Sequence, residues 1–126
     1  MKNIIAIFLV SILLFGGCVS MPTQQQLKSL DYGPPPQEGY EDAVKSNFED
    51  LLFDPHSAEY RFGKPRKCWM KDSNDLYAGY LVPVSVNAKN RFGGYVGFEQ
   101  YAAMLSQGRV VKILDRYTTD RVGCVD

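Results

Sequence analysis

Alternating apolar and polar positions mark residues 78–86 as the strongest predicted strand. The even positions include Val82, Val84 and Val86, and the odd positions are more mixed. This period of two is typical of a strand with one face on the core. Pro83 has no amide proton, so we expect an edge strand or a position whose amide points outward.

Residues 87–94, NAKNRFGG, predict a chain reversal after this strand. Asparagine side chains hydrogen-bond nearby backbone, and paired glycines permit turn conformations that other residues disfavour. A second strand is expected over residues 95–104, where Gln100 is the polar exception among apolar even-numbered positions. A bulge near Gln100 or a short helical piece over residues 100–105 would explain the exception.

Helical spacing of apolar residues predicts one helix over residues 40–53, ended by Pro55. Residues 115–126 have no clear period. We therefore expect an α+β fold in a single domain, residues 40–126, with this N-terminal helix packed on an antiparallel sheet of about four strands. Besides the central hairpin, strands are expected over residues 57–62, 64–71 and 109–114.

Two stretches carry a resemblance to a known group of proteins. DPHSAEYRFG, residues 54–63, and VNAKNRFGGYVG, residues 86–97, resemble a pattern in small bacterial lipoproteins and periplasmic proteins that carry a domain of unknown function. The resemblance extends over roughly residues 50–115. It implies a shared fold and no particular activity.

The N-terminus has the pattern of an export signal. Lys2 supplies a positive charge, and the apolar run of residues 4–15 is too short to span a bilayer as a mature helix. The following Gly-Gly-Cys18 resembles the bacterial lipoprotein signal, which implies cleavage after residue 17 and covalent diacylglycerol and N-acyl lipid on Cys18. The alternative is a conventional signal peptide with Cys18 as an ordinary thiol.

Lipidation would keep the protein on a membrane, because several acyl chains give stable anchoring. Val19 follows the cysteine in place of aspartate, which by resemblance to enterobacterial sorting implies the periplasmic face of the outer membrane. Residues 18–39 are rich in Gln and Pro and predict a flexible tether. Its proline run could instead be a docking ligand for an aromatic groove.

Charge argues against nucleic acid as a partner. The whole chain has 14 basic and 14 acidic side chains, so removing the leader with Lys2 leaves 13 basic against 14 acidic. Nucleic-acid binding depends on a strong basic excess. The expected partners are the membrane, through the lipid anchor, and an envelope protein or anionic glycan.

Cysteine usage predicts one disulfide. If Cys18 is lipidated, Cys68 and Cys124 remain as a pair in an oxidising compartment. Closing so long a loop would stabilise the fold by about 4 kcal/mol and would fix the aperiodic C-terminal tail to the sheet. The competing interpretation is one reactive thiol.

Catalytic and metal sites are not indicated by the residue pattern. His56 is the single histidine and is expected at a surface turn, and no metal-ligand spacing or cofactor motif is present. A carboxylate pair acting on a glycan is a minor alternative to solvated surface charges. The carboxylates concerned are Glu49, Asp50, Asp54, Asp115 and Asp120.

Two groups of residues are candidate contact surfaces. One is the loop set Asn87, Lys89, Asn90, Arg91 and Phe92, which suits recognition and also suits a tight reversal. The other is a basic concentration that could meet phosphates or anionic glycan, or could merely protect a strand edge. It comprises Lys64, Arg66 and Lys67, with Arg61 and Lys71 beside them.

Aromatic residues are expected mainly in the core and in cross-strand pairs, with a sugar-stacking platform as the alternative. These are Trp69, Tyr77, Tyr80, Tyr95 and Tyr101.

The leading hypothesis is a lipid-anchored periplasmic lipoprotein acting as a non-enzymatic binding or envelope-associated module. Alternatives are an envelope-assembly scaffold of the SmpA/OmlA type, suggested by architecture alone, and an inhibitor or phage-exclusion lipoprotein. A glycan-acting enzyme is the remaining alternative.

Overall fold

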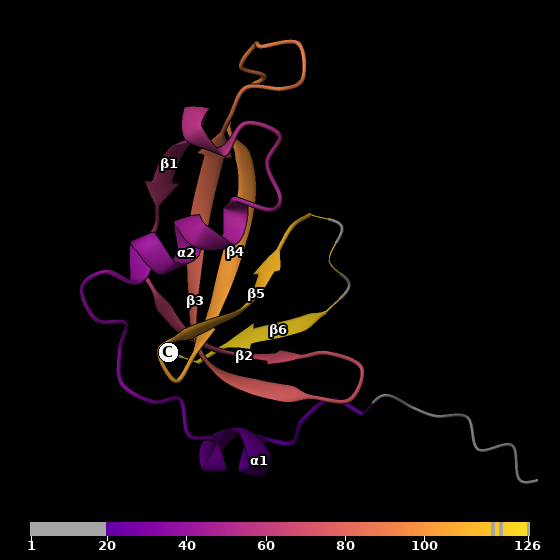
Figure 1. Ribbon diagram of the computed structural model, residues 1–126. Coiled ribbons are helices and arrows are strands. Elements are labelled where there is room, and N and C mark those ends of the chain that lie inside the picture. Colours follow the sequence, from indigo (N-terminus) through magenta and orange to yellow (C-terminus); the bar gives the residue numbers. More distant parts are fainter. Residues whose placement is uncertain (1–19, 117, 119, 126) are drawn as a thin grey trace, which may run out of the picture.

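The structure is a computed structural model and describes residues 20–116, 118 and 120–125. Within these, the fold is α+β and consists mainly of one antiparallel sheet (Figure 1). The helices are α1 (Gln24–Ser29), α2 (Tyr40–Phe48) and the 3₁₀ turn η1 (Pro55–Ser57). The strands are β1 (Glu59–Phe62), β2 (Arg66–Lys71), β3 (Leu76–Asn87), β4 (Glu99–Ser106), β5 (Arg109–Leu114) and β6 (Arg121–Cys124).

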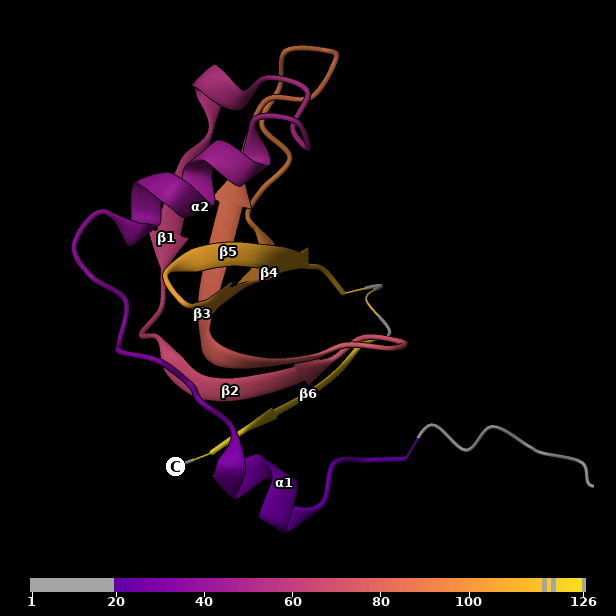
Figure 2. The same cartoon turned by 60° about the horizontal axis from the view of Figure 1, so that its bottom comes forward.

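The sheet has six strands, so the expectation of about four was too low. Its order is β5-β4-β3-β2-β6, with β1 paired to the C-terminal half of β3 beside β2. The long strand β3 bends strongly, and the sheet curls so that β5 and β6 approach each other from its two edges (Figure 2). Strands β1 and β2 correspond to the strands expected over residues 57–62 and 64–71, whereas β6, in the aperiodic tail, was not predicted.

Pro83 lies in the middle of the central strand and not at an edge. On one side it is opposite Ala102 of β4, and on the other its carbonyl accepts a hydrogen bond from the Gly63 amide at 2.8 Å. Here the pairing register shifts by one residue between β1 and β2. In an antiparallel ladder the N–H and C=O of one residue point to the same side, so an amide proton at position 83 would also point toward β1 and β2. The ladder is irregular there, and the missing proton costs no regular hydrogen bond. A proline is therefore tolerated in a central strand.

Helix α2 covers one face of β3 and β4. Val44 and Phe48 are fully buried against the even-numbered valines of β3. Phe48 makes edge-to-face contacts with Tyr60 and Tyr101, at centroid distances of 5.7 and 5.1 Å. We call this group the first cluster; its buried members are Val44, Phe48, Val82, Val84, Val86, Ala103 and Leu105.

The opposite face of the sheet has a smaller core inside the curl. Its buried members are Met70, Met104 and Leu114, with Tyr77, Leu81 and Ala102 packed against them. We call this the second cluster.

Two element boundaries and the position of one bulge differ from the prediction. Helix α2 ends at Phe48 instead of residue 53, because the chain turns there, and Leu52 packs on the first cluster while Leu51 is exposed. Strand β4 begins only at Glu99 and runs through Gln100 in regular register with β3. The bulge lies at Met104/Leu105, opposite β5, so both explanations offered for Gln100 were wrong.

The Gln- and Pro-rich segment contains more structure than its composition indicates. Thr23 and Gln26 form a reciprocal capping box that starts α1, and Leu27 is buried. Farther along, the amide of Gln107 donates to Asp31 at 3.4 Å. Capping and one buried leucine thus order a segment whose low hydrophobicity predicts a flexible tether.

Candidate binding surfaces

Asn90 organises the loop between β3 and β4, residues 88–98. Its side-chain oxygen accepts from the amides of Phe92 and Gly94 at 3.0 and 3.3 Å, while its backbone pairs with Gly93 and Gly94. Asn87 accepts from the Gly97 amide at 3.1 Å. Both asparagines therefore hold the backbone of the loop, and Arg91, Phe92 and Val96 are exposed on it.

The base of this loop is tied to η1. The Lys89 amide donates to the Ser57 hydroxyl at 2.8 Å, and the Tyr95 hydroxyl donates to the Ser57 carbonyl at 2.8 Å. The Lys89 ammonium lies 5.7 Å from the centre of the Tyr95 ring. The loop and the segment after α2 are therefore neighbours at one end of the molecule (Figure 1).

Four large apolar side chains are exposed at this end. Phe92 is 88% exposed, Phe53 72%, Val96 67% and Leu51 61%. We call these four residues the apolar tip. Arg91, also exposed, sits next to Phe92. Phe92 and Val96 lie on the loop, and Leu51 and Phe53 lie on the neighbouring segment after α2. Several large exposed apolar side chains on adjacent segments favour an interaction surface, whereas single ones are ordinary.

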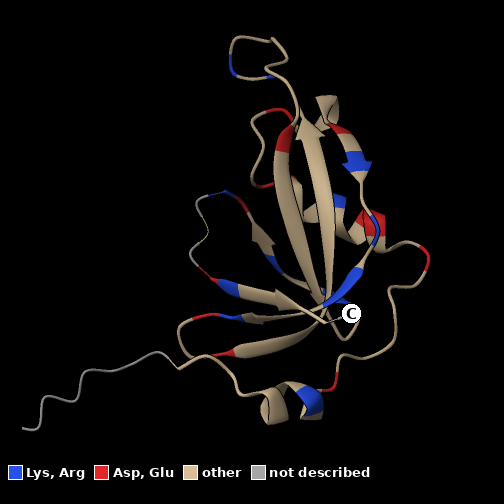
Figure 3. Ribbon diagram, turned by 180° about the vertical axis from the view of Figure 1, so that it is seen from behind, with Lys and Arg blue, Asp and Glu red and all other residues tan. Residues whose placement is uncertain are grey.

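The cluster of basic residues is separate from the apolar tip. Lys64, Arg66 and Lys67 are all exposed, but Arg66 pairs with Leu81, six residues before the end of β3 at Asn87. At the rise of an antiparallel strand this separation is about 20 Å. Figure 3 shows Lys and Arg distributed over several elements instead of gathered on one face.

The basic residues also contact different parts of the protein. The Arg61 guanidinium lies 3.8 Å from the centre of the Phe98 ring, and the Lys67 ammonium lies 5.7 Å from that of Tyr32. Lys71 donates to the Ser20 carbonyl at 2.8 Å. These three cations thus engage protein groups on different elements.

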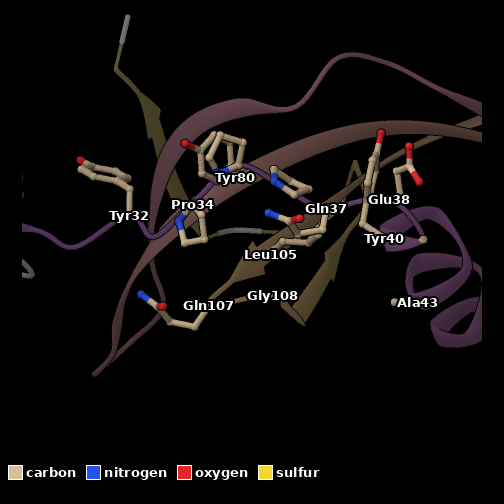
Figure 4. Close-up of a pocket in the computed structure, with 13 residues that line it drawn as sticks. Tyr32, Pro34, Gln37, Glu38, Tyr40, Ala43, Tyr80, Leu105, Gln107 and Gly108 are labelled. Carbon is tan, nitrogen blue, oxygen red and sulfur yellow. The ribbon is translucent and has the colours of Figure 1, made fainter.

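A cavity of about 270 Å³ lies between the proline-rich segment, the start of α2 and the β4–β5 turn (Figure 4). Burial raises the pKa of Tyr32, and burial with the Glu41 charge raises that of Tyr40. Sequence reasoning missed this site because its parts are far apart in the chain. Its lining includes Tyr32, Pro34–36, Gln37, Glu38, Tyr40, Tyr80, Leu105 and Gln107.

A second hollow, of about 470 Å³, lies where β4 begins and β5 ends. The Tyr101 hydroxyl donates to Glu99 Oε2 at 2.9 Å. Burial first, and then the Glu99 carboxylate, raises the pKa of Tyr101 to about 12. Its lining residues are Phe98, Glu99, Gln100, Tyr101, Asp115 and Arg116.

Cys68 and Cys124 form a disulfide, as the cysteine pattern predicts. They occupy directly opposed positions in the β2–β6 ladder, with a Cα–Cα distance of 3.9 Å. Gly123 is the neighbour that makes this possible, because a Cβ there would lie 2.6 Å from the indole of Trp69. The disulfide therefore attaches the last strand to the sheet.

Lys112 of β5 joins the two edges of the curled sheet. Its ammonium pairs with Asp120, just before β6, and with Asp72 in the β2–β3 turn at 3.3 Å. The hydrogen bond to Asp120 is the largest cause that raises the pKa of Lys112. Asp120, one of the candidate carboxylates, is thus held in an ion pair.

The remaining candidate carboxylates are dispersed. Glu49 and Asp50 follow α2 on the surface, and Asp54 accepts from the Ser57 amide at 3.3 Å as the cap of η1. Asp115 accepts from the Thr118 hydroxyl at 2.9 Å.

His56 lies exposed within η1, consistent with a surface turn. In the described part of the chain, no three His, Cys, Asp or Glu side chains gather as a metal site would require. Helices long and apolar enough to cross a bilayer are likewise absent from residues 20–116, 118 and 120–125. Cys18 and the expected leader lie outside the described residues.

Comparison of the chain with protein-family models, curated proteins and solved structures finds no match. The resemblance of residues 54–63 and 86–97 to small envelope lipoproteins therefore stays an expectation.

Proposed function

We propose that this protein is a membrane-anchored periplasmic lipoprotein that binds an envelope protein through its apolar tip. It acts by contact and not by catalysis, and the lipid on Cys18 holds it at the outer membrane. The observation that carries the proposal is the exposed Phe92 at the top of a loop whose backbone is fixed by two asparagines.

Such an arrangement favours binding for two reasons. Aromatic side chains bury a large area when they enter a partner's pocket, so they dominate many interfaces. A loop already held by the hydrogen bonds of Asn87 and Asn90 loses little conformational entropy on association. Arg91 adds a charged group at the rim, where it would steer the encounter with an acidic partner.

The position of the tip is consistent with an anchor at Cys18. The described chain begins at residue 20 at the end of the molecule opposite the loop (Figures 1 and 2). A lipid two residues earlier would leave the tip directed away from the membrane. A partner within the periplasm therefore fits this surface better than the bilayer that holds the anchor.

Photocrosslinking in intact cells tests the proposed surface. A photoreactive phenylalanine at position 92 should give one adduct of discrete mass with an envelope protein, and the same probe at position 64 should not. Replacing Lys89 and Arg91 with alanine should weaken the adduct at position 92. The matched control replaces Lys64, Arg66 and Lys67 with alanine and should leave it unchanged.

A failure of this experiment has a clear form. Adducts of equal yield at positions 92 and 64, or no adduct at either, would show that the tip is not a specific contact surface.

Mass spectrometry of the protein purified from membranes tests the anchor separately. The expected mature chain starts at Cys18 with three acyl groups and lacks two hydrogens because of the disulfide. A chain that starts elsewhere without lipid would remove the membrane part of the proposal.

A further inference from the structure

The cavity beside the proline-rich segment has a lining of distinct chemistry. Three tyrosines and three prolines supply apolar faces, while Gln37, Glu38 and Gln107 supply amide and carboxylate groups. Lysine and arginine are absent from the described residues that line it. The site therefore offers both donors and acceptors, and its one ionisable carboxylate disfavours an anion.

The rings are spread along the cavity and do not surround one point. Figure 4 shows Tyr32 toward one end and Tyr40 toward the other, with Tyr80 between them. A cage for a quaternary ammonium group would need the rings to enclose a single centre. This arrangement instead presents successive flat surfaces to an elongated ligand.

The walls are held in place by contacts outside the cavity. The Tyr32 hydroxyl donates to the Leu27 carbonyl at 3.2 Å, and this hydrogen bond fixes the position of the Tyr32 ring. Tyr40 packs edge-to-face on Phe62 at 6.3 Å, and Gln107 reaches Asp31. The cavity is thus largely preformed, which is usual for small-molecule sites.

We propose that this cavity binds a neutral carbohydrate of one or two rings. A sugar has apolar C–H faces that stack on tyrosine rings and hydroxyls that pair with amides and a carboxylate. A hydrocarbon chain of the same size would make no hydrogen bonds to Gln37, Glu38 and Gln107, whereas sugar hydroxyls can bond to all three. A volume of about 270 Å³ is at the small end of the range for ligand sites, which limits the ligand to this size.

The carbohydrate site is independent of the apolar tip. It lies at the β4–β5 turn, whereas the loop with Phe92 and Val96 precedes the other end of β4, a strand of eight residues. Variants can therefore separate the two activities.

Saturation-transfer NMR on the full-length protein in detergent tests the site. The probes are chitobiose, cellobiose and maltose at up to about 10 mM, a range that detects affinities near millimolar. At least one disaccharide should give a signal, and Tyr80→Leu should weaken its affinity about tenfold through loss of stacking. Gln107→Ala should weaken it as well, while Tyr80→Phe should retain it.

Phe92→Ala is the matched control, because it removes an exposed aromatic ring outside the cavity. It should leave sugar binding unchanged, even if it abolishes the crosslinked partner. Unfolding midpoints of all variants, measured in parallel, identify any loss caused by misfolding.

Three outcomes would overturn the proposal. One is the absence of signal for every disaccharide, and another is a signal that survives Tyr80→Leu in a folded protein. The third is binding of octanoate or tetramethylammonium with no binding of sugars, which would assign the cavity to another ligand class.

Discussion

The two faces of the curled sheet are stabilised in different ways. The first cluster lies under α2 and buries Phe48 and Val44 among the valines of β3. The second cluster has three buried members among the described residues. Beside it, the Cys68–Cys124 disulfide attaches β6 to β2, and the Lys112 ion pairs link β5 to Asp120 and Asp72. A domain this small has limited apolar area, so covalent and ionic links hold the part that burial does not.

The largest expected effect is on the helix-covered face. Phe48→Ala removes a fully buried ring that touches Tyr60 and Tyr101, and should lower the free energy of unfolding by about 3–5 kcal/mol. Chemical denaturation of the oxidised protein measures it. The control is Phe53→Ala, an exposed phenylalanine five residues later. Equal effects of the two substitutions would contradict the assigned core.

The disulfide should rank next. Replacing Cys68 and Cys124 together with alanine should lower the free energy of unfolding by about 2–4 kcal/mol, because the unfolded chain regains the entropy of an open loop. Hydrogen exchange should show the loss of protection first in β6, whose ladder partner is β2. Protection lost first in α2 would mean that the two faces are not separate.

Lys112→Met should have a smaller effect: it should lower the free energy of unfolding by about 1 kcal/mol at neutral pH, because the ion pair with Asp120 is lost.

The same variant should also change the response to acid. The pKa of Asp72 is lowered, first by the Ser73 amide and then by Lys112. The folded state therefore holds that proton more weakly, and stability declines as the pH falls below the ordinary carboxyl range. Denaturation midpoints across acid pH should show a shallower decline in the variant than in the wild type. An identical decline would exclude Lys112 as a cause.

The helix-covered face should respond to alkaline pH instead. Burial and Glu99 raise the pKa of Tyr101 from 10.0 to about 12, so the phenol ionises more readily in the unfolded chain. The stabilisation of the folded state by the neutral Tyr101 hydroxyl is therefore present below pH 10 and is lost as the pH rises toward 12. Tyr101→Phe should flatten this part of the pH–stability curve, measured by denaturation. A curve as steep as that of the wild type would assign the loss to other groups.

Phe92→Ala should have the smallest effect on stability, within about 0.5 kcal/mol, because the ring is exposed. Asn90→Ala should cost more than Phe92→Ala, since the Asn90 oxygen holds two loop amides. Thermal unfolding compares the two variants directly. A larger loss from Phe92→Ala would mean that the ring contributes to folding and is not available for a partner.

The sequence by itself determined the central strand, the helix start and the disulfide. Val82, Val84 and Val86 repeat at the period of a half-buried strand, and the spacing of Val44 and Phe48 suits one helical face. Cys68 and Cys124 were left as the one pair once Cys18 was assigned to the lipid anchor. These features depend on local periodicity or composition, which a linear pattern records.

Only the tertiary structure decided how distant segments meet. Strand β6 has no period of its own and exists because β2 offers a ladder partner, while Pro83 is acceptable because the register shifts opposite it. The cavity joins Tyr32, Tyr80 and Gln107 from three parts of the chain. The length of β3 from Leu81 to Asn87, about 20 Å, separates Arg66 from the loop that carries Phe92. Such placements are set by long-range pairing and packing, which leave no periodic signal in the sequence.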